Sequence, residues 1–269
     1  MSTKLRLEGV GKVFAIGNGQ STTALQDFTL DVAAGEFMVV VGPSGCGKTT
    51  VLNLLAGLDV PTQGTVSMDG RTITAPGPER GVMFQDYALF PWQTVHGNIE
   101  FGLRHGPAGR ALDASARNAR TQSCIDLVGL GNAATKYPHQ LSGGMRQRVA
   151  LARLLAIEPE VLLMDEPLAA LDAQTRLILQ DELLRIWGQS RPAHERRTVV
   201  FITHAIDEAV FLADRIAVMT THPGRLKAVI DVPLARPRND ATRASSEFQA
   251  LAQHIWSLIR DEAYRATVT

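Results

Sequence analysis

The chain has 269 residues, 45% of them hydrophobic, so it can bury one large core or two small ones. Its 27 basic and 27 acidic residues balance and form no basic patch, which argues against nucleic acid as a partner. With no apolar stretch of ~18 residues, no signal sequence and only two cysteines, it is expected to be a soluble, unexported chain of a reducing cytoplasm, without a disulfide framework or zinc site.

The first third of the chain has the pattern of antiparallel strands. Residues 5–10 and 28–32 alternate apolar and polar side chains, and a glycine-containing loop lies between them at residues 17–19. Residues 64–71 alternate in the same way and end at an Asp-Gly turn signal. These segments predict a small β-rich subdomain.

An apolar run at residues 37–41 leads directly into the pattern G-x-x-x-x-G-K-[ST], which predicts a strand, a phosphate-binding loop and a helix. Glycines let consecutive N–H groups wrap a polyphosphate, while Lys48 adds a charge for its β- and γ-phosphates. The hydroxyl of Thr49, at the start of the helix, can bind Mg²⁺. The predicted nucleotide-binding residues of the loop are Gly42, Pro43, Ser44, Gly45, Cys46, Gly47, Lys48, Thr49 and Thr50.

Residues 87–159 have a mostly helical pattern and are predicted to be a helical insertion in an α/β core. Near its end, Ser142 precedes two glycines and then an apolar face at helical spacing. Ser142 is therefore expected to cap a helix whose first N–H groups, at Gly143 and Gly144, form a second anion site. Two phosphate-binding sites in one chain are expected if two copies of the chain bind each nucleotide between them.

Residues 161–164 form an apolar run without alternation, as a strand covered on both faces would, and two acids follow it. At the carboxyl end of such a strand, Asp165 is expected to hold Mg²⁺ through water and Glu166 to polarise the attacking water. The competing interpretation is that the pair caps the next helix. Residues 198–203 form a second run of this kind and predict another buried strand, which would end beside His204.

The motif at residues 141–148 resembles the signature of the ATP-binding cassette (ABC) ATPases, and other cassette motifs follow the order of that family. The resemblance covers nearly the whole chain. It implies that Gln85 is the Q-loop glutamine, His204 the switch histidine and Phe14 the aromatic side chain that stacks on adenine. Residues 169–172 resemble the D-loop, in which Asp172 is retained while Ala169 stands where serine is frequent.

The implied fold is an α/β P-loop NTPase core of the ABC type, with an antiparallel β subdomain and an inserted helical subdomain. The expected organisation is an ABC ATPase domain at residues 1–240 and a C-terminal helical tail at 241–269 that packs on it. The resemblance implies an ATPase that uses ATP and Mg²⁺ and closes as an ATP-dependent homodimer. Its catalytic residues would be Gln85, Glu166 and His204, and its metal ligands Thr49, Gln85 and Asp165.

Residues 76–85, 89–92, 208–211 and 223–225 are similar to the ATPases of taurine, aliphatic sulfonate and nitrate importers. The implied function is that of a peripheral subunit on the cytoplasmic face of the membrane, which drives uptake together with separate permease subunits and a periplasmic or lipoprotein substrate-binding protein. The alternative is a soluble cassette ATPase of a non-transport machine such as iron–sulfur cluster assembly.

The aromatic segment from Tyr87 to Trp92 follows Gln85 directly. The resemblance implies that it receives a helix of the permease. The competing interpretation is that these aromatic side chains pack in the core of the helical subdomain.

Overall fold

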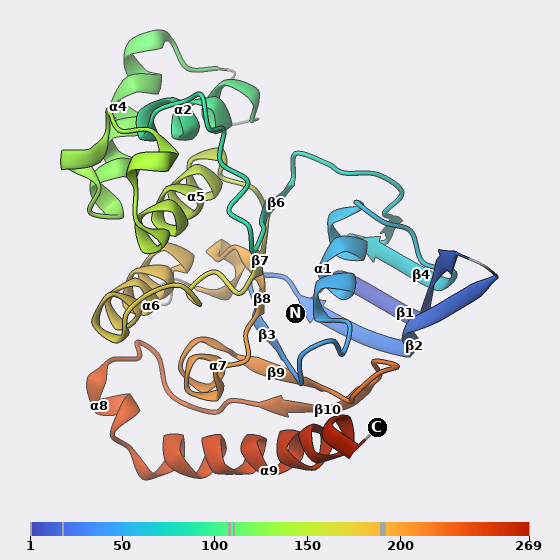
Figure 1. Cartoon of the computed structure of the whole chain (residues 1–269). Helices are drawn as coiled ribbons and strands as arrows, with labels where there is room; N and C mark the ends of the chain where they lie inside the picture. The colour runs from blue at the N-terminus through green and yellow to red at the C-terminus, as the bar shows by residue number, and fades with distance from the viewer. Residues whose placement is uncertain (1, 18, 107–108, 110, 189–191, 269) are drawn as a thin grey trace. The chain divides into compact units, whose positions relative to one another are not determined.

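The computed structural model describes residues 2–17, 19–106, 109, 111–188 and 192–268 (Figure 1). The chain divides into two compact units, which are described separately. The first unit holds Met1–Gly77 and Gln180–Thr269, and the second holds Pro78–Leu179.

The first unit contains an antiparallel sheet with the strand order β2-β1-β4-β5 (Figure 1). Its strands are β1 (Thr3–Gly17), β2 (Gln20–Ala33), β4 (Gln63–Met68) and β5 (Arg71–Thr72). The predicted strand segments are confirmed, but β1 and β2 run further, because register shifts let their pairing continue past the alternating residues. Position 18, in the predicted loop, lies outside the described residues.

The first unit also contains the strands β10-β9-β3-β8, which are neighbours in that order. Their bounds are β3 (Phe37–Val41), β8 (Thr198–Ile202), β9 (Arg215–Met219) and β10 (Leu226–Asp231). Strand β3 pairs in parallel with β8 and β9, whereas β10 is antiparallel to β9. Every residue of β3 and β8 is buried, as continuous apolar runs predict.

The first unit contains in full one 3-10 helix and four α-helices among the residues that the structure describes. They are α1 (Lys48–Ala56), η3 (Ala193–Glu195), α7 (Ile206–Leu212), α8 (Asp240–Arg243) and α9 (Ser246–Val268). Gly57 ends α1 at a φ of 74°, a conformation that glycine adopts without strain. Helix α9 packs against α7 and β9 and buries Phe248 and Ile255 (Figure 1).

The second unit pairs β6 (Arg80–Met83) in parallel with β7 (Val161–Asp165). Its helical elements are α2 (Val95–His105), α4 (Ala114–Leu127), η1 (Gly131–Ala133), η2 (Pro138–Gln140) and α5 (Gly143–Ile157). Helix α6 (Ala173–Trp187) begins in the second unit and ends in the first. Thr94 and Asp113 cap α2 and α4 with side-chain oxygens, and apolar residues of α2, α4 and α5 form one buried cluster. The predicted helical character of this segment is confirmed.

Among the residues that the structure describes, no helix is both long enough and apolar enough to cross a membrane.

Candidate functional site

The phosphate loop connects β3 with α1 in the first unit. Gly45 and Gly47 have φ angles of 75° and 96°, which residues other than glycine rarely adopt. A Cβ atom on Gly47 would also lie 2.9 Å from the main-chain oxygen of Ala24 and from Cδ2 of Leu25. Both the backbone and the space around it therefore require glycine at position 47.

Lys48 is buried and its ammonium group lies within the loop. Nζ donates hydrogen bonds of 2.8 Å to the carbonyl oxygens of Gly42 and Pro43 and lies 3.8 Å from Sγ of Cys46. Burial raises the pKa of the Cys46 thiol, so this side chain stays protonated at neutral pH. Cys46 is thus a packing residue of the loop, whereas Lys48 brings a fixed positive charge to it.

The outer residues of the loop are open to solvent. Ser44, Gly45 and Thr49 are exposed, and Thr50 is half-buried. Phe14, near the end of β1, is 38% exposed, and its ring centroid lies 4.8 Å from Nζ of Lys12. An aromatic face is therefore accessible for stacking in the same unit as the loop.

His204 is exposed in the turn between β8 and α7. The hydroxyl of Thr203 fixes this turn, because it donates a 2.7 Å hydrogen bond to the buried carboxylate of Glu208 and accepts the N–H of Ala205 at 3.0 Å. The histidine is therefore presented on a braced turn at the carboxyl end of a buried parallel strand.

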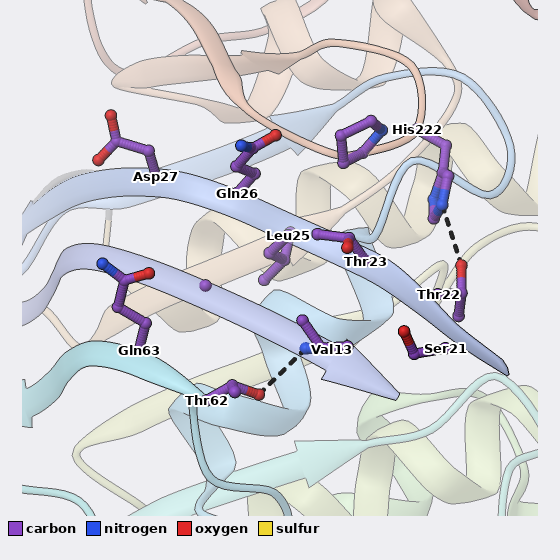
Figure 2. A pocket seen from close by; sticks show the side chains of 12 residues that line it. Val13, Ser21, Thr22, Thr23, Leu25, Gln26, Asp27, Thr62, Gln63 and His222 are labelled. Atoms are coloured by element: carbon purple, nitrogen blue, oxygen red, sulfur yellow. Dashed lines mark hydrogen bonds between the residues drawn. The ribbon is translucent and has the colours of Figure 1, made fainter. Parts of the chain in front are cut away.

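A cavity of about 530 Å³ lies beside the antiparallel sheet of the first unit (Figure 2). Its lining residues include Val13, Thr22, Leu25, Gln63 and His222. Nε2 of His222 lies 3.0 Å from the hydroxyl of Thr22. His222 was not predicted to have a role, although it directly precedes the motif at residues 223–225.

In the second unit, β7 carries the predicted acidic pair to its carboxyl end. Asp165 is 5% exposed. Glu166 has a φ of 47°, so the chain has already turned out of the strand direction at this residue. The side-chain amide of Gln147, on α5, donates a 3.3 Å hydrogen bond to the main-chain oxygen of Glu166. Helix α5 thereby holds the turn that carries the second acid.

Ser142 caps α5, as predicted: its hydroxyl accepts the N–H of Met145 at 3.3 Å. Gly143 and Gly144 are partly exposed in the first turn. A Cβ atom on Gly144 would lie 3.0 Å from Cδ2 of Leu171, so this turn lies against the segment at residues 169–172. There, the carboxylate of Asp172 accepts the N–H of Thr175 at 2.9 Å, which holds the pKa of that carboxyl below its usual range.

The aromatic segment of the second unit is partly buried and partly exposed. Leu89 packs on the helical core, whereas the side chain of Trp92 is 70% exposed. The centroid of the Phe90 ring lies 5.6 Å from that of Trp92 and 4.4 Å from that of Phe101. Packing in the helical core therefore applies to Leu89 but not to Trp92, and a permease contact at this segment stays a prediction.

Arg153 fixes the start of the same segment and was not predicted. Its guanidinium donates to the carbonyl oxygens of Tyr87 and Ala88 at 2.9 and 2.7 Å, and burial lowers its pKa. Both carbonyls belong to residues with positive φ angles. The only sign of this contact in the sequence was the charge of Arg153 within the apolar pattern of α5.

The predicted site residues fall into two groups. The first unit holds Phe14, the phosphate loop and His204. The second unit holds Gln85, which is exposed, together with the strand-end acids, the capped turn of α5 and Asp172.

Known proteins identify this arrangement. The sequence profile of the ABC transporter family matches residues 25–169. An uncharacterized ABC transporter ATP-binding protein of Methanocaldococcus jannaschii is 47% identical over 266 residues, which cover 99% of this chain and 95% of that protein. The chain belongs to the ABC transporter ATP-binding family. It is therefore an ATPase, and the ABC fold predicted from the sequence is confirmed.

Two further ABC proteins extend the comparison. The bicarbonate transport ATP-binding protein CmpC of Synechococcus elongatus is 47% identical over 239 residues, which cover 88% of this chain but 35% of CmpC. A solved dimeric structure of the ATP-binding cassette MJ0796, bound to ADP and Pi, superposes with a TM-score of 0.74 and 31% identity, covering 85% of this chain and 98% of that one.

Proposed function

We propose that this chain is the ATP-hydrolysing subunit of an ABC importer that takes up a small anion, such as taurine, an aliphatic sulfonate or nitrate. The observation that carries the proposal is the 47% identity to CmpC over 88% of this chain, since CmpC is named for the transport of bicarbonate, another small anion. The sulfonate- and nitrate-type motifs at residues 76–85 and 223–225 favour the same class.

ATP binding is assigned to the phosphate loop and Phe14. The loop N–H groups and Lys48 would hold the phosphates, because a fixed ammonium group offsets charge that N–H groups alone leave unbalanced. The exposed ring of Phe14 would stack on the adenine. Cys46 and the loop glycines contribute their backbone only.

The oxygen donors of Thr49, Gln85 and Asp165 suit Mg²⁺, which prefers hard oxygen ligands and keeps several waters. Within the described ranges, no three histidine, cysteine or acidic side chains cluster as a metal site. A magnesium ion held by one carboxylate, a hydroxyl, an amide and phosphate needs no such cluster. When bound, the ion would neutralise charge on the β- and γ-phosphates.

Hydrolysis is assigned to Glu166 as the group that accepts a proton from the attacking water, with His204 and Gln85 supporting it. Ser142, Gly143, Gly144 and Asp172 would face the phosphates of a second copy in a head-to-tail homodimer. The partial exposure of Gly143 and Gly144 in the first turn of α5 supports this role, as does the dimeric state named for the MJ0796 cassette.

In this proposal, residues 1–240 act as one ATPase domain with the helical subdomain at about 87–159, and residues 241–269 are its tail. The exposed Trp92 marks the surface for the permease, at the cytoplasmic face of the membrane. A periplasmic or lipoprotein substrate-binding protein would deliver the anion.

The test is co-expression with a candidate multi-spanning permease of the anion-importer class. The tagged chain should co-purify with the permease. Proteoliposomes that contain the complex should take up the labelled anion only when ATP is present on the side of the membrane that carries the ATPase subunit. Co-purification with a soluble assembly machine instead of a permease would replace the transport function with the alternative one.

A further inference from the structure

A buried acid on the C-terminal helix connects that helix to β10 and to the turn before it. Glu262 of α9 is 1% exposed. Its Oε1 accepts a 2.7 Å bond from Nζ of Lys227, and its Oε2 accepts the N–H of Thr221 at 3.1 Å. Lys227 also donates to the main-chain oxygen of Leu258 on α9, at 2.9 Å. One carboxylate thus ties α9 both to β10 and to the turn that precedes it.

That turn, residues 220–225, is closed on itself. The N–H of Thr220 donates to the oxygen of Arg225 at 3.0 Å, and the N–H of Arg225 donates to the hydroxyl of Thr220 at 3.0 Å. The turn is therefore a compact loop, and Glu262 anchors it at Thr221.

The other side of the turn pairs with β2. Gly224 donates to the oxygen of Ala24 at 2.9 Å and accepts the N–H of Gln26 at 3.0 Å, and the guanidinium of Arg225 donates to Oε1 of Gln26 at 2.6 Å. His222 faces Thr22 of the same strand (Figure 2). Each of these contacts joins the turn to residues 22–26.

The turn and β2 both pack directly on the phosphate loop. A Cβ atom on Gly224 would lie 2.0 Å from the main-chain oxygen of Cys46. Ala24 and Leu25 pack in the same way on Gly47, where a Cβ atom would lie 2.9 Å from each. The turn that Glu262 anchors therefore packs directly against the backbone of the phosphate loop.

We propose that Glu262 is a positioning residue for ATP binding, which acts through Thr221 and Gly224 on the backbone at Cys46 and Gly47. The proposal rests on the assignment of ATP binding to the phosphate loop. A carboxylate suits the role because it accepts from the N–H of Thr221 and from the ammonium group of Lys227 together. An amide in its place would direct its NH₂ group at one of these two donors.

The test is the Kd for ATP of the full chain carrying Glu262→Gln, measured together with KM and kcat of hydrolysis. We expect Kd and KM to rise by roughly 2- to 30-fold, the range for changes within such contact networks, with kcat nearly unchanged. Hydrogen exchange of peptides over residues 42–49 should become faster. An unchanged Kd together with unchanged exchange would overturn the proposal.

Two variants separate positioning from general stability. Ile255→Val trims another buried side chain of α9 and should lower Tm without raising Kd. If it raises Kd as much as Glu262→Gln does, helix docking alone is responsible and the proposal fails.

Should Glu262→Gln not fold, Glu262→Asp takes its place. The shorter side chain keeps the charge for Lys227 but withdraws it from Thr221, and a wild-type Kd for ATP in this variant would equally overturn the proposal. Loss of ATP binding in Lys48→Ala tests the loop assignment separately.

Discussion

The side-chain amide of Gln147 holds the main-chain oxygen of Glu166 at 3.3 Å. Helix α5, which Ser142 caps, is thereby connected to the acid that we assign to hydrolysis. Gln147 is 1% exposed, and no partner is found for its Oε1 within the described part of the chain. Gln147 therefore contributes to the site through the hydrogen bond that it donates to Glu166.

Replacing Gln147 with methionine keeps the volume of the side chain and removes this donor. We expect kcat of ATP hydrolysis to fall, by up to about 10²-fold, since small displacements of catalytic groups have costs of that size. The Kd for ATP should stay near the wild-type value, because the phosphate loop is untouched. Steady-state hydrolysis and nucleotide titration measure the two quantities, and a wild-type kcat would show that Glu166 needs no such support.

Lys48→Ala should abolish ATP binding. The substitution removes the ammonium group that lies against the carbonyl oxygens of Gly42 and Pro43, and with it the positive charge of the loop. Titration with a fluorescent ATP analogue measures the loss. The control is Lys4→Ala, which removes an ion pair with Asp69 and changes no residue of the phosphate loop. This variant should bind ATP with the wild-type affinity. Retained affinity in Lys48→Ala would refute the assignment of the loop.

Ser142→Arg should block closure of the homodimer by bulk and spare ATP binding to the monomer. The hydroxyl of Ser142 also caps α5, so part of any effect comes from the lost cap, about 1 kcal/mol. Ser142→Ala loses the same cap without adding bulk and is the matched control. The two variants are compared by the dependence of ATPase rate on protein concentration. Equal cooperativity in both variants would argue against an interface at this turn.

Trp92→Ala should leave the isolated chain folded and able to bind ATP, yet weaken association with the permease by about 2 kcal/mol or more. Because the side chain is 70% exposed, we expect Tm to change by no more than about 2 °C. Pull-down of the permease and thermal unfolding measure both effects. A fall of about ten degrees in Tm, with transport retained, would assign Trp92 to the core.

The sequence predicted the elements whose signals are local. The strands β3, β7 and β8 and the capping role of Ser142 all follow from neighbouring residues. The extension of β1 and β2 was not predictable, because it depends on register shifts between two strands that are paired in space.

The buried charges also could not be predicted. Arg153 and Glu262 each bond groups distant in the sequence, so their partners are defined only once the helices have packed. The contact of His222 with Thr22 depends on the pairing of the turn with β2, so it was not predictable either. Arg153 is visible in the sequence only as a charged position within an apolar pattern.

Glu166→Gln tests the central claim most directly, because the amide cannot accept the proton of the attacking water. Turnover should fall by roughly 10²–10⁴-fold while ATP binding survives. With Mg²⁺ and ATP, the variant should elute in size-exclusion chromatography with light scattering at twice the chain mass of 29.1 kDa, and at the monomer mass without nucleotide. A variant that binds ATP and hydrolyses it at the wild-type rate as a monomer would contradict the account.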